Sequence, residues 1–121
     1  MTKPHKKLVA WSKNMDLVET IYELTKTFPR EEIYGLTSQL RRAAVSVPSN
    51  IAEGAAGRST VQFRNYLGVA LGSLNELDTQ LEIARRVGYL SSQVFEISEA
   101  LLDECIAVTY GLRKSLDRRT I

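Results

Sequence analysis

The side chains best suited to chemistry in this sequence are one imidazole and one thiol, His5 and Cys105. A carboxylate-bridged metal pair in a helical bundle needs inward glutamates and a Glu-x-x-His pair on two helices, and histidine-based triads need a histidine near the nucleophile. His5 lies outside the predicted helices. Cys105 falls among Leu101, Val108 and Leu112 on an apolar helical stripe, which is typical of a core residue. We therefore expect no catalytic residue, no metal, no cofactor and no enzyme activity.

Two arginines in the middle of a predicted helix are the next group with chemical potential. Arg41 and Arg42 stand beside Gln39, where planar guanidinium donors can contact phosphate. The same arginines can instead form ion pairs with acids such as Glu76 or Glu82 on a neighbouring helix. The sequence leaves both alternatives open.

A short segment that contains two glycines, Gly54 to Ser59 (GAAGRS), precedes another predicted helix. Backbone amides at the start of a helix can bind phosphate, but the spacing of a standard phosphate-binding loop is missing. We favour the interpretation that these residues end one helix and cap the next.

Length and composition indicate one domain over residues 1–121, long enough to bury a real core. The formal net charge is only +2, so electrostatic arguments depend on where the charges lie. A basic start, MTKPHKK, is followed by an apolar stretch too short for a signal peptide or a membrane span. We expect a cytoplasmic protein without membrane contact, in which residues 1–7 form a flexible basic arm.

Apolar spacing and helix-boundary residues predict four helices. The first covers about residues 8–27 and stops before Pro29. Glu31 and Glu32 open the second, which runs to about residue 53, because acidic residues complement the positive end of a helix dipole.

The third and fourth helices have clearer caps. Ser59 and Gln62 form a capping box for a helix that ends at Gly88, and its apolar positions repeat in the heptad pattern of a left-handed bundle. Ser91 caps a fourth helix that reaches about residue 118. Four helices joined by short turns predict an all-α, up-down-up-down four-helix bundle.

The second predicted helix contains Pro48 without losing its apolar period. The positions spaced three or four apart are Ile33, Leu36, Leu40, Ala43, Val47 and Ile51. An unbroken period favours one helix kinked at Pro48 over a break. Ser46 and Asn50 flank the proline, where their side chains can satisfy backbone groups that it frees.

The first predicted helix has an apolar arc of roughly 200°, wider than the roughly 100° stripe of an ordinary surface helix. One stripe contains Trp11 and Tyr22, and a second stripe beside it contains Leu17, Ile21, Leu24 and Phe28. Either the helix packs against two neighbours in its own bundle, or the excess is covered by another subunit. We expect self-association, with Leu17, Ile21, Leu24 and Phe28 at the oligomer interface.

A set of short motifs resembles one protein family. The residues that carry the resemblance are Phe28, Pro29, Glu32, Tyr34 to Thr37, Gln39 to Ala43, Ser46, Pro48, Asn50 to Gly54, Gly72 to Leu74, Glu76, Leu77 and Thr79. They are similar to the small four-helix-bundle proteins encoded by intervening sequences in bacterial 23S ribosomal RNA genes, some of which were labelled ribosomal proteins. The core Ser-x-Pro-x-Asn-Ile-Ala-Glu-Gly is its most specific part.

The resemblance implies a homopentamer, since known members are pentameric barrels. Similar accessory proteins of diversity-generating retroelements bind nucleic acid and a reverse transcriptase, which implies RNA or DNA as a partner here. The family has no known catalytic role. We interpret its motif residues Arg42, Ser46, Pro48, Asn50, Glu53 and Gly54 as structural, with Arg42 and Glu53 in an ion pair or an interface.

Basic residues from three separate segments meet at one pole of an up-down bundle. The predicted nucleic-acid-binding residues are Lys6, Lys7, Arg58, Arg64, Arg113, Lys114, Arg118 and Arg119. Lys3 lies with them, and only Glu53 and Asp117 oppose them. Part of this cluster also suits a helix C-terminus, where cations complement the dipole.

Two hypotheses of different classes follow. The first is a non-enzymatic homo-oligomer that binds RNA or DNA through this pole, with strong salt dependence and little sequence preference. The alternative is a protein-binding scaffold without nucleic-acid contact.

Overall fold

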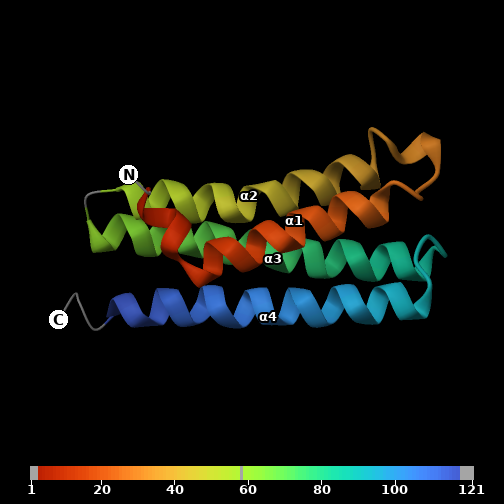
Figure 1. Cartoon of the computed structure of the whole chain (residues 1–121). Coiled ribbons are helices and arrows are strands. Elements are labelled where there is room, and N and C mark those ends of the chain that lie inside the picture. The colour runs from red at the N-terminus through yellow and green to blue at the C-terminus, as the bar shows by residue number, and fades with distance from the viewer. Residues whose placement is uncertain (1–2, 58, 118–121) are drawn as a thin grey trace.

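The computed structural model describes residues 3–57 and 59–117, which form four long helices and two short 3-10 turns (Figure 1). Their order is η1 (Pro4–Lys7), α1 (Val9–Thr25), η2 (Arg30–Glu32), α2 (Leu36–Ala56), α3 (Thr60–Arg86) and α4 (Ser92–Asp117). The described residues contain no strand. The predicted all-α class is therefore confirmed.

Each long helix packs against the helices before and after it, and α4 closes the circle against α1. The diagonal pairs, α1 with α3 and α2 with α4, make no close backbone approach in the described chain. The heptad positions of α3 from Leu67 to Ala84 face the middle of this bundle and are completely buried. This arrangement confirms the up-down-up-down topology expected from the short connections.

The helix ends follow local side-chain chemistry. Ser59 Oγ accepts a hydrogen bond from the Gln62 amide at 3.1 Å, and Ser91 Oγ accepts one from the Val94 amide at 3.1 Å. Gly88 ends α3 with a φ of 86°, a conformation that glycine adopts without steric cost. The amide of Tyr89 then donates to the Ala84 carbonyl at 2.9 Å, which completes a Schellman motif.

The start of the second helix differs from the prediction. Glu31 and Glu32 lie in η2, and α2 begins only at Leu36. Glu32 nevertheless caps α2 from outside, because its Oε1 accepts from the Leu36 amide at 3.1 Å and its Oε2 accepts from the Tyr89 hydroxyl at 2.8 Å. These two hydrogen bonds hold the pKa of Glu32 below its ordinary value. The carboxylate thereby links the loop before α2 to the turn after α3.

Pro48 is buried inside α2, and the helix continues past it, as the apolar period predicts. Proline has no N–H, so the Ala44 carbonyl loses its usual donor. Neighbouring carbonyls gain side-chain donors: Ser49 Oγ donates to Val45 at 2.7 Å, and Asn50 Nδ2 donates to Ser46 at 2.8 Å. The polar residues around the proline thus stabilise the helix on either side of the missing bond.

The broad apolar arc of α1 is mostly used within one chain. Leu17 and Ile21 have no exposed surface, and Leu24 and Phe28 are each 8% exposed. These side chains are buried because α1 packs against both α2 and α4. The prediction that these four residues form an oligomer interface is therefore incompatible with the structure, since their surface already lies in the core.

The N-terminal segment also differs from the prediction of a free arm. Residues Pro4 to Lys7 form η1, which packs against α1 and α2. The ring of His5 lies edge-on to that of Trp11, with centroids 5.1 Å apart. The predicted arm is therefore wrong for residues 4–7, while residues 1 and 2 lie outside the described part.

Gly54 allows α3 to pack closely against α2, and its substitution tests this packing. A Cβ at this position would lie 2.8 Å from Phe63 Cδ1 and 2.9 Å from Tyr66 Cβ. We expect Gly54→Ala to lower the free energy of unfolding by about 1–3 kcal/mol, because overpacking forces the helices apart. Urea denaturation at matched protein concentration measures the change.

The matched control is Gly72→Ala, in α3, where an added Cβ meets nothing within 4 Å. Alanine there should stabilise the protein by about 0.5–1 kcal/mol through helix propensity alone. Equal effects at the two positions would contradict the role assigned to Gly54.

Candidate nucleic-acid interface

Three parts of the chain that are distant in sequence lie together at one end of the bundle, here called the basic pole. They are η1, the junction of α2 with α3, and the C-terminal end of α4 (Figure 1). The opposite end, here called the turn pole, holds η2 and the turn between α3 and α4. The up-down order therefore gathers the basic segments as expected.

The exposed lysines are the freest cations of the basic pole. Lys6 and Lys7 are exposed on η1, and Lys114 is exposed on the last turns of α4. Within the described part of the chain, none of the three ammonium groups forms a hydrogen bond or an ion pair. Their charges are therefore available to an anion in solution.

The two described arginines of the pole also hold α3 to α4. Arg64 Nε lies 3.0 Å from Asp117 Oδ1, and Arg113 Nε donates to the Arg64 carbonyl at 3.2 Å. Both side chains are half-buried. A guanidinium has five N–H donors, so one such bond leaves others for a phosphate oxygen. Arg58, Arg118 and Arg119, the other predicted residues of this interface, lie outside the described residues.

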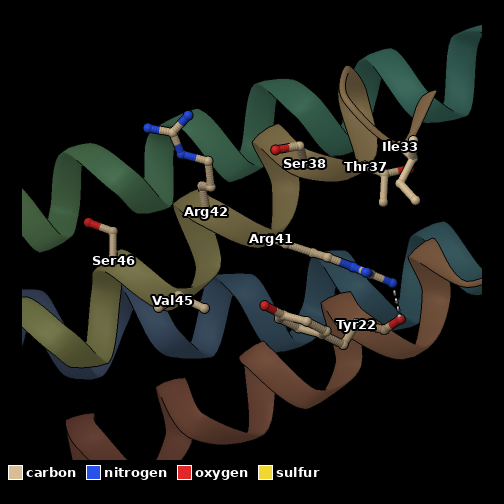
Figure 2. Close-up of a pocket in the computed structure, with 8 residues that line it drawn as sticks. All are labelled: Tyr22, Ile33, Thr37, Ser38, Arg41, Arg42, Val45 and Ser46. Atoms are coloured by element: carbon tan, nitrogen blue, oxygen red, sulfur yellow. Dashed lines mark hydrogen bonds between the residues drawn. The ribbon is translucent and has the colours of Figure 1, made fainter. Parts of the chain in front are cut away.

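Arg41 is part of the architecture of the α1–α2 pair. Its Nε donates to Thr25 Oγ1 at 2.9 Å and its Nη2 to the Tyr22 carbonyl at 3.4 Å. The guanidinium also lies 4.6 Å from the centroid of the Tyr22 ring, and Figure 2 shows the two side chains together. Arg41 therefore caps the C-terminal end of α1, where cations are favoured.

Arg42 has a different environment, although it is the next residue. Figure 2 shows its side chain directed away from Tyr22 and toward α3. It is exposed and forms no ion pair within the described chain, whereas Glu82 pairs with Arg85 and Arg86. Glu53 is likewise exposed and makes no ion pair with a described residue. The predicted ion pairs of Arg42 and Glu53 are therefore not formed within this part of the chain, and an interface role remains a prediction.

A groove of about 510 Å³ lies between α1 and α2 near Arg41 and Arg42 (Figure 2). Its lining contains no acidic side chain and consists of Tyr22, Ile33, Thr37, Ser38, Arg41, Arg42, Val45 and Ser46. Three of its apolar side chains are well exposed: Ile33, Val45 and Tyr22. The groove therefore combines positive charge with apolar surface.

Two of the remaining motif residues, Ser46 and Gly54, lie where α2 contacts α3. Ser73 Oγ donates to Ser46 Oγ at 2.9 Å, and Asn50 Nδ2 lies 3.0 Å from the same Ser46 oxygen. Pro48 and Gly54 are buried on the same helix. The hydrogen bonds of Ser46 and the burial of Gly54 fit the structural role predicted for these residues, which stays a prediction.

Cys105 is completely buried, and its Sγ donates to the Lys13 carbonyl at 3.5 Å. Burial raises the pKa of this thiol to about 12, so it stays protonated at neutral pH. The interpretation of Cys105 as a core residue is confirmed. Among the described residues, no group of three histidine, cysteine or acidic side chains is placed to hold a metal ion, and no helix is long and apolar enough to cross a membrane.

An acidic cluster between α3 and α4 was not anticipated from the sequence. Burial raises the pKa of Glu99 to about 7, helped by a hydrogen bond to Asp78 and by the charges of Asp78, Asp103 and Glu82. Asp78 and Glu82 are four residues apart in α3, and Glu99 and Asp103 are four residues apart in α4. Each pair therefore lies on one face of its helix. Only the position of α3 along α4 shows that these two pairs of acids lie together.

Fold and surface together define a small helical-bundle protein without a recognisable catalytic constellation in its described part. The sequence matches the family of 23S rRNA-intervening sequence proteins over residues 6–111, and the chain belongs to that family. No curated protein matches it.

A solved structure has the same fold. It is a protein of unknown function from the S23 ribosomal protein family of Bacteroides thetaiotaomicron VPI-5482. The two sequences are 25% identical, and the TM-score is 0.81. The comparison covers 88% of this chain and 96% of that one.

The acidic cluster predicts an unusual dependence of stability on pH. Because the folded protein raises the pKa of Glu99 to about 7, it binds a proton that the unfolded chain releases near its ordinary value of 4.5. Stability should therefore fall as pH rises from about 4.5 to about 7. Glu99→Gln should raise the Tm at pH 8 and leave it nearly unchanged at pH 4, as thermal unfolding monitored by circular dichroism would show.

Glu96→Gln provides the control, because Glu96 is an exposed glutamate on the same helix. Its effect on Tm should be small at both pH values. A Glu99→Gln protein with the same pH dependence as wild type would refute the assignment.

Proposed function

We propose that this protein is a non-enzymatic homo-oligomer that binds RNA or DNA through its basic pole. The observation that supports this most directly is the meeting of basic side chains from η1, α3 and α4 at one end of the bundle. The described part of that end has Lys3, Lys6, Lys7, Arg64, Arg113 and Lys114 against Glu53 and Asp117. Asp117 is already paired with Arg64.

Positive side chains on one surface bind nucleic acid mainly by neutralising phosphates and releasing counterions. Contacts to phosphate position the polymer without reading its sequence. Assembly into an oligomer would multiply the charge presented at one end, which strengthens attraction even though the chain carries a formal charge of only +2. The resemblance to pentameric family members favours five subunits.

The exposed lysines allow a test that spares the contacts between α3 and α4. Replacing Lys6, Lys7 and Lys114 together by glutamine should weaken binding of a labelled single-stranded oligonucleotide. The slope of log affinity against log salt should become shallower by up to about 2, since each single-strand phosphate contact contributes about 0.7. Fluorescence anisotropy across a salt series measures both quantities.

The matched control replaces two exposed basic residues of the turn pole, Lys26 and Arg30, by glutamine and is compared with the Lys6 and Lys7 double variant. It removes the same charge and should leave affinity and salt slope nearly unchanged. An equal loss in both variants would show that net charge, and not the basic pole, determines binding. No binding by wild type even at low salt would favour the protein-scaffold function.

The scaffold alternative is supported by apolar surface at the turn pole. Tyr34 is 95% exposed and Ile33 is 53% exposed beside it. A second groove, of about 550 Å³, lies between α1 and α4 and contains Leu90 and Ile97. Such surface suits a protein partner better than a phosphate backbone.

Self-association can be tested independently of nucleic acid. We expect a mass above that of one chain, with five chains as the family-based value. Light scattering during size-exclusion chromatography at micromolar concentration measures it. A monomeric mass would refute self-association, and a different multiple would refute only the number five.

A further inference from the structure

We propose that self-association joins two different faces of the bundle, with the α1–α2 groove of one copy docked on the acidic α3–α4 face of the next. This inference rests on the self-association in the proposed function and adds the surfaces that carry it. We call the first surface the arginine ridge, formed by Arg41, Arg42, Ile33 and Val45. We call the second the acidic face, formed by Asp78, Glu99, Asp103 and Ile83.

The two surfaces have complementary charge. The lining of the α1–α2 groove contains two arginines and no acid. The groove between α3 and α4 contains Asp78, Glu82 and Glu99 against the single base Arg86, and Asp103 adds to its negative charge. Complementary charge steers association and opposes wrong pairings.

On each surface, charged groups lack an oppositely charged partner within the described residues. Arg42 forms no ion pair with a described residue and extends away from Arg41 and Tyr22 (Figure 2). On the other surface Glu82 is neutralised by Arg85 and Arg86, but Asp78 and Glu99 face each other without a base between them. An arginine from outside would satisfy both carboxylates, because a guanidinium can donate to two acceptors at once.

Both surfaces also carry exposed apolar groups that a contact would bury. Ile33 and Val45 on the arginine ridge are 53% and 40% exposed, and Ile83 on the acidic face is 45% exposed. Beside Arg42, the α2–α3 groove includes Gln80, whose Oε1 is buried without a hydrogen-bond partner in the described chain.

The two surfaces lie at the same level along the bundle. Arg42 lines a groove together with Glu76 and Gln80 of α3, so it stands at the level of Asp78 between them. Glu99 reaches that level from α4, since it interacts with Asp78. A rotation about an axis parallel to the helices can therefore bring one surface against the other without a shift along the axis.

The surfaces also lie on opposite sides, because α1–α2 and α3–α4 are opposite pairs in the order in which the helices pack. A contact between two different surfaces is heterologous, and repeating it gives a ring when the rotation closes. A two-fold dimer would instead pair one surface with its own copy. A head-to-tail contact of this kind therefore gives an assembly of more than two chains.

Charge reversal tests the pairing. Arg42→Glu alone, and Asp78→Arg with Glu99→Arg together, should each raise the protein concentration at half-assembly by about tenfold or more. All three substitutions in one chain should restore assembly, since the pair is then reversed and still complementary. Sedimentation velocity over a concentration series measures assembly, and circular dichroism verifies that each variant is folded.

The matched control is Lys3→Glu, the same charge change at an exposed residue of the basic pole. It should assemble like wild type. An oligomeric wild type whose assembly is unaffected by Arg42→Glu would overturn this interface while leaving self-association intact. A wild-type mass of two chains would overturn the head-to-tail arrangement, and a monomeric wild type would overturn both proposals.

Discussion

The close approach of α2 and α3 is the constraint on which the rest of the structure depends. A buried glycine, Gly54, lets Phe63 and Tyr66 lie against the backbone of α2. One side chain hydroxyl, that of Ser73, donates across the seam to Ser46. Small side chains at these positions allow two long helices to share an extensive contact, and a larger group would separate them. Because the seam sets the level of α3 against α2, it also decides which charges of the two helices lie side by side.

The opposite pair, α1 and α4, contains a buried polar contact between the two helices. Asn14 has no exposed surface, and its Nδ2 donates to the Ala10 carbonyl at 2.7 Å and to Thr109 Oγ1 at 3.0 Å. A buried amide is costly unless it is hydrogen-bonded, so it penalises any register that separates it from its partner. We interpret this pair as fixing the position of α1 along α4.

The two poles of the bundle have different characters. At the turn pole, Glu32 joins the start of α2 to the turn after α3. At the basic pole, Lys6, Lys7 and Lys114 have no hydrogen-bond or ion-pair partner for their ammonium groups in the described chain. Arg64 and Arg113 join α3 to α4 and are also partly exposed. Binding of a polyanion at one end and contact between copies along the side are therefore compatible, since they use different surfaces.

Local features of the sequence determined the helices and most of their ends. Apolar period, the caps Ser59 and Ser91, and the terminator Gly88 act between residues a few positions apart, so they can be interpreted without knowing the fold. The continuation of α2 through Pro48 also follows from the local apolar period. Even the gathering of basic segments at one pole follows from helix order alone.

Tertiary packing decided what local spacing left ambiguous. Two adjacent apolar stripes on α1 look alike in sequence, and only contact with α2 and α4 shows that Leu17 and Ile21 belong to the core. Arg41 and Arg42 are neighbours of identical type, yet a rotation of 100° along the helix gives one a structural partner and leaves the other free for an interface. The meeting of Asp78 with Glu99 depends on register between helices, which arises from the summed packing of many side chains and from no single local pattern.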